Sequence, residues 1–444
     1  VSSAYAAGPG ATNSCSGDTP LPDFRPTAND GDAGASLRLT WHGTVVANLP
    51  MAFLHDGIPM PTREAVVVTE RHEGTEARRH GVPEPVLPDP SCLRASVPSC
   101  LLHHLSSPNT ASKHRVVRQY DHEVQGNTIV KPFVGPLQIG PADAAVVRPK
   151  ADSHRGVAIA CGLAPHLSLT DGCYAMAVAS IDEAVRNAIC VGVDPERLAL
   201  LDNFCWPGTD SPEAMGTLVE ACEACRDVAL AWGTPFVSGK DSLHNQHTDQ
   251  TTGVTTRIPP TLLISAFGIV DDVRRCVTSD LKRVDDELWL VRPTTNPASP
   301  EREQAGSAAM PTESHSLTLG ARDDHLNDRW QAHLEVSRLV RSGNVTAAHD
   351  VSDGGWLVAA AEMAIGGDLG LDLNHADVPF DEPMTTYLLA GRDLDFGPAV
   401  ETVRLGTVVD APRLKFRDGS EVTVADCRRA WRGEGDAEAA ASLT

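Results

Sequence analysis

The pattern of apolar and polar positions predicts a domain of mixed sheet and helix in the middle of the chain. Between residues 112 and 270, strand-like and helix-like patterns follow one another, which is typical of an α/β or α+β domain built around one sheet. Short apolar runs predict strands at residues 142–148, 197–203, 235–237 and 261–270.

Two helices are predicted between these strands. The first covers residues 174–191 and ends at Gly192. The second has Ser211 as its N-cap and Pro212 at its first position, and it ends at Gly233. Serine can accept a hydrogen bond from the free N–H groups of a helix start, and glycine readily adopts the left-handed conformation that closes a helix.

A second domain is predicted downstream. It begins with a strand at residues 287–291 and continues through a polar insert at 294–325 and a helix at 328–341. The stretch AAHDVSDGG then leads into a helix that ends at Gly366. Residues 1–40 lack a usable period, so we expect disorder or the degraded edge of a lost domain there, and we expect the tail after Trp431 to be unstructured.

Composition and charge narrow the class of protein. The 444 residues are 41% hydrophobic, which is enough to bury two cores, and the net charge of -22 disfavours nucleic acid as a partner. No apolar run approaches the ~18 residues that a membrane span needs, and no secretion signal opens the chain, so we expect a cytoplasmic protein without a membrane partner. Because the chain starts at Val1, we expect a fragment, a processed product or an incomplete gene model.

The cysteines and one histidine pair are expected to be structural. The 11 cysteines are scattered through apolar segments, as in a reduced protein. Cys222 and Cys225 form a CxxC inside a helical pattern without a second pair nearby, which favours core packing over zinc or redox chemistry. His103 and His104 are interpreted as a surface feature.

Oxygen-bearing side chains stand where predicted strands end and helices begin. Asp143 lies at a strand start, Asp202 follows four apolar residues, and Glu183 and Asn187 are one helical turn apart. The loop SGKDS contributes Gly239, Lys240, Asp241 and Ser242. Carboxylate, amide and hydroxyl oxygens are what a Mg²⁺ ion bridging phosphates requires, and glycine lets backbone N–H groups approach a phosphate closely.

Each of these features also has a simpler explanation. Glu183 and Asn187 could be a solvated helix face, and Asp202 could be a cap or a turn residue. The SGKDS loop lacks the spacing of the GxxxxGK[ST] phosphate motif. The HDVSDGG stretch could merely start a helix, with Ser352 or Asp353 as its cap.

Four segments, in the same order, resemble the signature stretches of the phosphoribosylformylglycinamidine synthase family. They are SKHRVVRQYDHEVQGNTIVKPFVG (112–135), IDEAVRNAICVGVDPERLALLDNFCWP (181–207), PFVSGKDSL (235–243) and HDVSDGGWLVAAAEMA (349–364). FLHDGIPMPTRE (53–64) is similar to the end of the preceding lobe. The resemblance implies the C-terminal half of the synthase.

The resemblance also implies a fold. Each half of this family is aminoimidazole ribonucleotide (AIR) synthase-like, with an N-terminal α/β domain that contributes strands to a shared β-barrel and a C-terminal α/β domain. We therefore expect residues 1–110 to be a partly disordered remnant of the preceding lobe and its linker. Residues 111–285 and 286–432 are expected to form the two domains of the second copy, followed by a tail at 433–444.

The reaction implied is an ATP-dependent ligation. Formylglycinamide ribonucleotide, ATP and glutamine-derived ammonia give formylglycinamidine ribonucleotide, ADP and phosphate in purine biosynthesis. The implied cofactors are Mg²⁺ and ATP or ADP, and the implied partners are an N-terminal half and a glutamine amidotransferase domain or subunit.

Site residues carry over from the family by position. The implied metal ligands are Asp143, Glu183, Asn187 and Asp241, and the implied nucleotide contacts beside them are Lys113 and Ala142. In the larger synthases that site holds a structural nucleotide. Asp202 and Gly239 resemble residues lent to ATP in the catalytic pocket and Ser242 one lent to the substrate, while Lys240 stands where some members have a metal-binding Asn.

Departures from the family pattern leave other functions open. The catalytic histidines and the substrate-binding residues of the first half have no equivalent after Val1. AGSAAM (305–310) replaces a clear GGS-type turn, and DEPMTTYLL (381–389) replaces an ESxxRxLL pattern. The alternative is a noncatalytic Mg-nucleotide-binding structural module of the same fold, and a kinase-like relative making selenophosphate or thiamine diphosphate is a weaker hypothesis.

Overall fold

The computed structural model describes residues 23–27, 36–56, 62–67, 96–119, 123, 126–294, 320–374, 380 and 382–434. The chain divides into two compact units, 1–63 and 64–444. The tail at 435–444, AGSAAM and most of the predicted linker and insert lie outside the described residues. The domain boundaries at 110 and 285 stay predictions.

The first unit is a small antiparallel sheet followed by a short helix. Its strands are β1 (Asp23–Thr27), β2 (Ser36–Trp41) and β3 (Thr44–Pro50), and the helix is α1 (Met51–Asp56). Disorder was expected through residue 40, and β1 and β2 correct that prediction for their residues. Each strand is so short that its apolar pattern does not stand out in the sequence. Pairing with the neighbouring strand holds it in place.

The second unit contains two large sheets. The first is a six-stranded mixed sheet in the order β10-β9-β13-β8-β7-β4. The strands are β4 (Thr128–Val130), β7 (Ala144–Val147), β8 (Gly156–Leu163), β9 (Leu198–Cys205), β10 (Phe236–Ser242) and β13 (Thr261–Val270). Four of them confirm the predicted strands, with β10 longer than expected, and β4 and β8 were missed. Among the described residues the sheet is open and not closed into a barrel.

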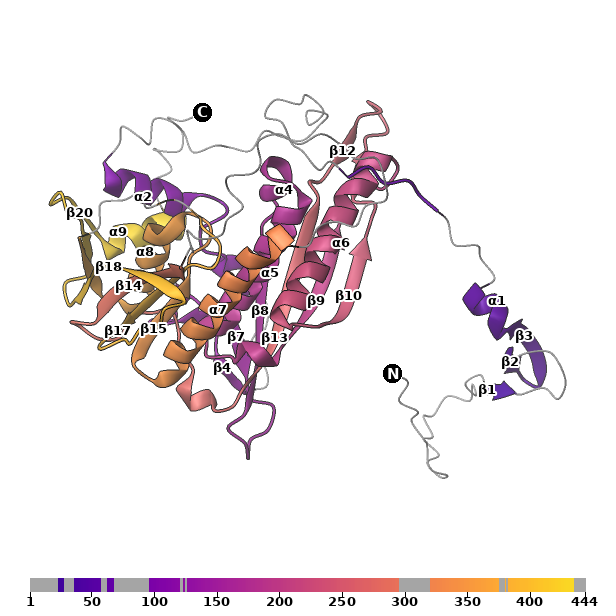
Figure 1. The fold of residues 1–444 in the computed structure, drawn as a ribbon, viewed down its shortest axis with the longest axis horizontal. Helices are drawn as coiled ribbons and strands as arrows, with labels where there is room; N and C mark the ends of the chain where they lie inside the picture. The colour runs from indigo at the N-terminus through magenta and orange to yellow at the C-terminus, as the bar shows by residue number, and fades with distance from the viewer. Residues whose placement is uncertain are drawn as a thin grey trace. The chain divides into compact units, whose positions relative to one another are not determined.

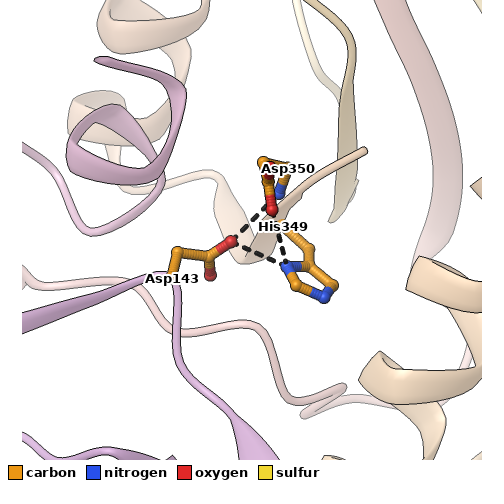
Figure 2. A group of neighbouring side chains, drawn as sticks. All are labelled: Asp143, His349 and Asp350. Carbon is orange, nitrogen blue, oxygen red and sulfur yellow. Dashed lines mark hydrogen bonds and ion pairs between the residues drawn. The ribbon is translucent and has the colours of Figure 1, made fainter. Parts of the chain in front are cut away.

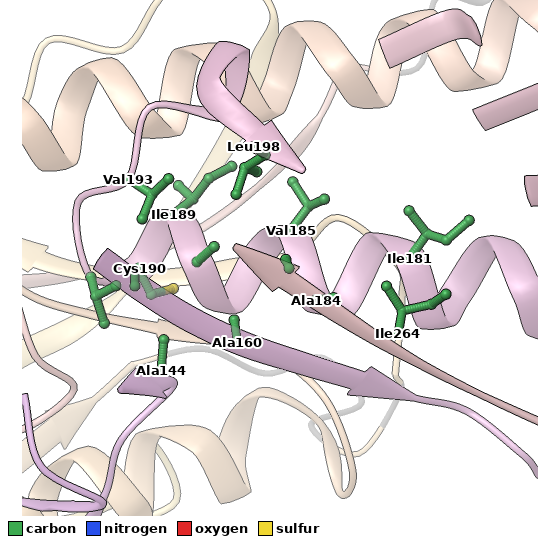
Figure 3. Close-up of a cluster of buried hydrophobic side chains, with 14 of the residues drawn as sticks. Ala144, Ala160, Ile181, Ala184, Val185, Ile189, Cys190, Val193, Leu198 and Ile264 are labelled. Carbon is green, nitrogen blue, oxygen red and sulfur yellow. The ribbon is translucent and has the colours of Figure 1, made fainter. Parts of the chain in front are cut away.

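Two helices cover one face of this sheet (Figure 1). They are α5 (Cys173–Cys190) and α6 (Pro212–Trp232), both within one residue of the predicted bounds. The Ser211 side chain accepts a hydrogen bond from the Ala214 N–H, and Gly233 is left-handed with φ of 67°, as the sequence predicted. Side chains of α5 pack against small residues of β7 and β8 in the core shown in Figure 3.

A second, seven-stranded sheet follows in the order β15-β17-β14-β18-β16-β19-β20. Its strands are β14 (Glu287–Pro293), β15 (Val345–Asp350), β16 (Gly370–Leu373), β17 (Tyr387–Gly391), β18 (Val400–Val409), β19 (Arg413–Lys415) and β20 (Glu421–Thr423). Its helices are α7 (Gly320–Ser342), α8 (Gly355–Gly367) and α9 (Val424–Trp431). This mixed architecture confirms the α/β, α+β fold class.

Helix α7 joins the two sheets. It contacts α5 and α6 of the first sheet and β14 and β15 of the second (Figure 1). The Trp232 indole N–H of α6 donates to the Leu326 carbonyl oxygen of α7 across 2.8 Å. The two sheets are therefore connected through α7. The candidate site lies where they meet, at the start of β7 and the end of β15.

Shorter elements complete the second unit. They are α2 (Val97–Ser106), α3 (His114–Val117), α4 (Leu167–Thr170), β5 (Phe133–Val134), β6 (Gly140–Pro141), β11 (Gln246–Thr248), β12 (Thr255–Arg257) and two 3-10 turns, Pro195–Arg197 and Val273–Arg275. In the part of the chain that the structure describes, no helix has the length and hydrophobicity needed to cross a bilayer.

The members of the CxxC pair and of the histidine pair differ in exposure. Cys225 is half-buried against the core of the first sheet, which confirms its packing role, whereas Cys222 is exposed and was wrongly placed in the core. Residues three apart are offset by about 60° around a helix, so Cys222 can lie at the solvent edge of the stripe that Cys225 joins. His103 is exposed, while His104 stacks on Phe380 at a ring distance of 4.3 Å.

Candidate functional site

Three buried side chains from two distant segments meet where the two sheets join (Figure 2). Asp143 stands directly before β7, and His349 and Asp350 are the last two residues of β15. The His349 ring donates from Nδ1 to Asp143 Oδ1 at 2.7 Å, and the Asp350 backbone N–H donates to the same oxygen at 3.0 Å. We call these three residues the junction cluster.

Carboxylates hold both ring nitrogens of His349. Nε2 lies 3.2 Å from Glu362 Oε2 on α8, and the other oxygen of Glu362 accepts from the Trp431 indole at 3.0 Å. Burial alone would lower the pKa of His349, but Asp143 and Glu362 raise it well above its usual value. His349 therefore acts as a buried cation that donates from both nitrogens.

Helix α5 adds charged groups beside the junction cluster. The Arg186 guanidinium lies 3.3 Å from Asp350 and also binds Asp182. Burial raises the pKa of Asp350 to about 6, with Arg186 opposing and Asp143 adding to the rise. Burial and the Asp350 carboxylate also raise the pKa of Glu183 to about 7. Extra negative charge at this junction is thus disfavoured unless a cation is bound.

The junction cluster fits a hard divalent cation. Its ligand atoms lie within 4.8 Å of one another, and Asp143 Oδ2 is buried without a hydrogen-bond partner among the described residues. A buried carboxylate oxygen without a donor is costly, and a metal ion would satisfy it. Since His349 uses both nitrogens, the available donors are carboxylate oxygens, the ligand type that Mg²⁺ takes.

The predicted residues on α5 lie next to this cluster. The Glu183 carboxylate accepts from the Leu163 N–H at 2.8 Å. The Asn187 amide donates to the Cys161 carbonyl oxygen at 2.9 Å, which leaves its own oxygen as an acceptor. Both side chains therefore face the end of β8, and neither belongs to a solvated helix face.

The predicted nucleotide contacts stand at the rim of the same region. Ala142 precedes Asp143 and is half-buried. Lys113 donates to the carbonyl oxygens of Pro108 and Asn109 at 2.8 and 2.9 Å. Burial lowers the pKa of Lys113, although the carboxylates of Asp353 and Glu362 act in the opposite direction.

The remaining predicted residues form a second polar group on β9 and β10. Gly239 pairs with Asp202, and a Cβ at position 239 would lie 2.3 Å from Asp202 Oδ1, so a side chain there would displace the Asp202 carboxylate. Lys240 donates to the Ser242 hydroxyl. Burial and Asp241 raise the pKa of Asp202.

The predicted metal set is therefore only partly assembled. Among the described residues, Asp143 forms a cluster of potential metal ligands with His349 and Asp350, and Asp241 is not a member of that cluster. The metal role of Asp241 stays a prediction of the resemblance. His349, Asp350 and Glu362 were missed, although Asp350 follows the buried strand VTAAH just as Asp202 follows LALL.

The capping prediction for HDVSDGG was wrong. Helix α8 begins after Gly354 without a side-chain cap from Ser352 or Asp353. Gly354 is left-handed with φ of 86°, and its N–H donates to Glu382 Oε1 at 2.6 Å. A carboxylate from a distant segment thus replaces the local cap.

A small pocket, open to solvent and with about 60 Å³ of free volume, adjoins the junction cluster. Its lining combines charged and apolar groups from α5, the end of β8, the loop after β15 and the segment before β17, including Leu163, Glu183, Arg186, Asp353, Glu382 and Met384. Cations beside carboxylates and apolar walls suit a metal-bound phosphate compound with an apolar part.

Two family descriptions match the first sheet and the first part of the second sheet in turn. Residues 112–269 match the FGAR-AT PurM_N-like domain, and residues 285–395 match the C-terminal domain of AIR synthase related proteins. The chain is 34% identical over 404 residues to the phosphoribosylformylglycinamidine synthase subunit PurL of Deinococcus radiodurans, covering 87% of this chain and 51% of the relative. The chain belongs to the phosphoribosylformylglycinamidine synthase family.

Two further synthase subunits match the chain to a similar extent. PurL of Anaeromyxobacter dehalogenans is 31% identical over 429 residues, covering 90% of this chain and 52% of the relative. PurL of Synechococcus elongatus is 32% identical over 367 residues, covering 78% and 44%. The chain thus spans about half the length of the synthase subunits it matches.

Solved structures of the family share the fold. The PurLQS structure from Thermotoga maritima superposes with a TM-score of 0.51 at 19% identity, covering 84% of this chain and 48% of that one. T. maritima PurL complexed with AMPPCP gives a TM-score of 0.51 at 18% identity, covering 84% and 51%. These likenesses establish the fold alone.

Proposed function

We propose that this chain is the C-terminal half of a phosphoribosylformylglycinamidine synthase and contributes one side of an ATP-dependent, amidine-forming active site. The observation that carries the proposal is 34% identity to PurL across 87% of the chain. The proposed reaction joins nitrogen to carbon: ATP phosphorylates the amide oxygen of formylglycinamide ribonucleotide, and ammonia displaces the phosphate. The products are formylglycinamidine ribonucleotide, ADP and phosphate, formed in the cytoplasm.

The junction cluster supports a Mg-nucleotide site. Asp143, Asp350 and Glu183 would hold the ion, with the free amide oxygen of Asn187 one helical turn from Glu183. Mg²⁺, when bound, neutralises charge on the phosphates of the nucleotide. Lys113 and Ala142 lie beside these residues and are proposed to contact the nucleotide. T. maritima PurL has been solved in complex with ATP, which accords with this role.

The second polar group supports a contribution to a shared catalytic pocket. Asp202 and Gly239 lie side by side on β9 and β10, and Ser242 follows on the same edge strand. We propose that the first two contact ATP and that Ser242 contacts the substrate. Groups on an edge strand can complete a pocket whose other wall belongs to a second half.

The uncovered face of the first sheet supports such a partner half. On β8, Ile159 and Leu163 point away from α5 and are 38% and 46% exposed, and Val237 on β10 is 64% exposed. Exposed apolar side chains on a sheet are unfavourable in water, and another sheet would bury them. We propose that an N-terminal half closes this sheet into the shared barrel, with a glutamine amidotransferase domain or subunit supplying ammonia.

Native mass spectrometry and a mixing assay test the proposal. The purified chain is expected to retain ADP or ATP in a form that EDTA releases. Mixing it with the N-terminal half of the D. radiodurans relative should give ADP formation that depends on formylglycinamide ribonucleotide and ammonia. Asp202→Asn, at the second polar group, is the matched variant and should lower that turnover while leaving retained nucleotide unchanged.

Two outcomes would contradict the proposal in different ways. Retained nucleotide without turnover on mixing with any family N-terminal half would indicate the noncatalytic structural module. Absence of any EDTA-releasable nucleotide would refute the Mg-nucleotide site itself.

A further inference from the structure

A buried carboxylate on α5 that the proposed reaction does not use binds the segment before β17. Asp182 is fully buried and accepts hydrogen bonds from the Thr385 N–H at 2.8 Å and from the Thr385 hydroxyl. Its other partners are Arg186 on α5 and His333 on α7, whose Nε2 lies 3.2 Å away. Asp182 therefore connects three elements at the junction of the two sheets.

The partners of Asp182 favour its ionised form. Burial alone would raise the pKa of Asp182, but Arg186 and His333 hold it well below its usual range. Hydrogen bonds to an ionised acceptor are stronger than those to a neutral one. The hydrogen bonds that Thr385 donates to Asp182 are therefore charge-assisted.

Thr385 needs such a contact because its backbone is strained. Its φ is 57°, in the left-handed region that β-branched residues avoid, and its side chain is fully buried. Such conformations persist only when the surroundings hold them, and they concentrate at functional sites. Asp182 supplies two of the interactions that hold Thr385.

The strained residue sets one wall of the pocket beside the junction cluster. Glu382 and Met384 line that pocket and lie within three residues of Thr385. Glu382 also accepts from the Gly354 N–H, and its carboxylate lies 3.9 Å from the His166 ring. A change in the backbone at Thr385 would therefore move both lining residues.

We propose that Asp182 is a positioning residue for nucleotide binding: by holding Thr385 in the left-handed conformation, it places Glu382 and Met384 as the pocket wall that receives the nucleotide. The inference rests on the proposed nucleotide site. Asp182 touches no ligand in this scheme, and its effect reaches the pocket through the backbone of residues 382–385.

Isothermal titration with MgADP and hydrogen-deuterium exchange of residues 382–390 test this role in four proteins. These are the parent chain, Asp182→Asn, Thr385→Gly and the double variant. Asp182→Asn should weaken MgADP binding about tenfold and speed exchange in 382–390, because one charged acceptor is lost. Thr385→Gly should bind within about twofold of the parent, since glycine adopts positive φ at no steric cost.

The double variant is the decisive protein. Because glycine does not need to be held, it should recover most of the MgADP affinity that Asp182→Asn loses. A double variant no better than Asp182→Asn would overturn the proposal, as would parent-like affinity and exchange in Asp182→Asn. If the parent chain itself fails to bind MgADP, the proposed nucleotide site fails instead.

Thr385→Ala keeps the proposal testable if Asp182→Asn does not fold. This variant keeps a Cβ in the left-handed backbone and removes the hydroxyl donor to Asp182 together with the γ-methyl group. MgADP affinity should fall several-fold, while Mg²⁺ binding without nucleotide stays unchanged because the contact between Arg186 and Asp350 remains. Equal loss of both affinities, or loss of neither, would contradict a positioning role.

Discussion

The Asp350 backbone N–H donates to Asp143 Oδ1 across 3.0 Å, although the two residues are 207 positions apart. Asp143 stands at the start of β7 in the first sheet, and Asp350 ends β15 in the second. The junction cluster therefore exists only when the two sheets are packed together. Metal binding at this place is expected to stabilise their association, because a ligand that binds only the folded state shifts the folding equilibrium.

The junction cluster predicts that Asp143 is needed for metal binding. Asp143→Asn should weaken Mg²⁺ binding at least about tenfold, because the buried oxygen without a donor becomes part of a neutral amide. Asp241→Asn is the matched control and should change the affinity by no more than about twofold if Asp241 stays beside Asp202. Titration with Mg²⁺ measures both. Equal loss in the two variants would support the metal set that the resemblance implies, with Asp241 as a ligand.

The raised pKa values of Glu183 and Asp350 predict that the metal-free protein loses stability as pH rises. Their pKa values, about 7 and about 6, lie above those of ordinary acids, so the folded state binds more protons than the unfolded state in this range. Their contribution is present below about pH 4 and is lost as pH rises through 6 and 7. A shift of about two units corresponds to about 3 kcal/mol.

Thermal melting in EDTA between pH 5 and pH 8 checks this prediction. The melting temperature should fall with rising pH, and added Mg²⁺ should reduce the fall. Glu183→Gln should flatten the curve because it removes one of the two titrating groups. A melting temperature that is constant or rises over this range would contradict the prediction.

A close backbone approach predicts that Gly140 tolerates no side chain. A Cβ at this position would lie 2.5 Å from the Cα of Gly366, where the β5–β6 hairpin meets α8. Gly140→Ala should destabilise the fold by about 1–3 kcal/mol, the usual cost of overpacking. Gly208→Ala is the control, because its Cβ would meet only side-chain ends, Asp210 Oδ2 at 3.3 Å and Gln246 Oε1 at 3.6 Å. Urea unfolding compares them, and equal midpoints would refute the steric argument.

Substitutions of the two cysteines of α6 are expected to lower the stability of the protein by different amounts. Neither substitution is expected to change its zinc content. Burial raises the pKa of Cys225 to about 12, so its thiol should resist alkylation at pH 8. Cys225→Ser should cost about 1 kcal/mol because a polar group replaces a half-buried one, and Cys222→Ser should cost less. Zinc analysis of both variants should match the parent. Loss of bound zinc in either would overturn this interpretation.

Local features of this chain could be predicted because their causes are local. The bounds of α6 follow from Ser211 and Gly233, whose side-chain and backbone preferences act on neighbouring residues. Strand β13 was predicted from a nearly continuous apolar run, and its residues alternate in burial because successive side chains point to opposite faces of the sheet. In contrast, β8 was missed because its residues are mostly small, and small residues are selected there by the close packing of α5.

The sequence by itself determined the fold class, the family and the candidates Asp143, Glu183 and Asn187, because ordered motifs and helical spacing are readable along the chain. Only the tertiary structure decided that Asp350 and His349 join Asp143, and that Thr385 is held left-handed by Asp182. Such pairs are separated by some 200 residues, and no period or propensity relates them. Their contacts arise when two sheets pack, and the cost of burying charge then selects which groups must meet.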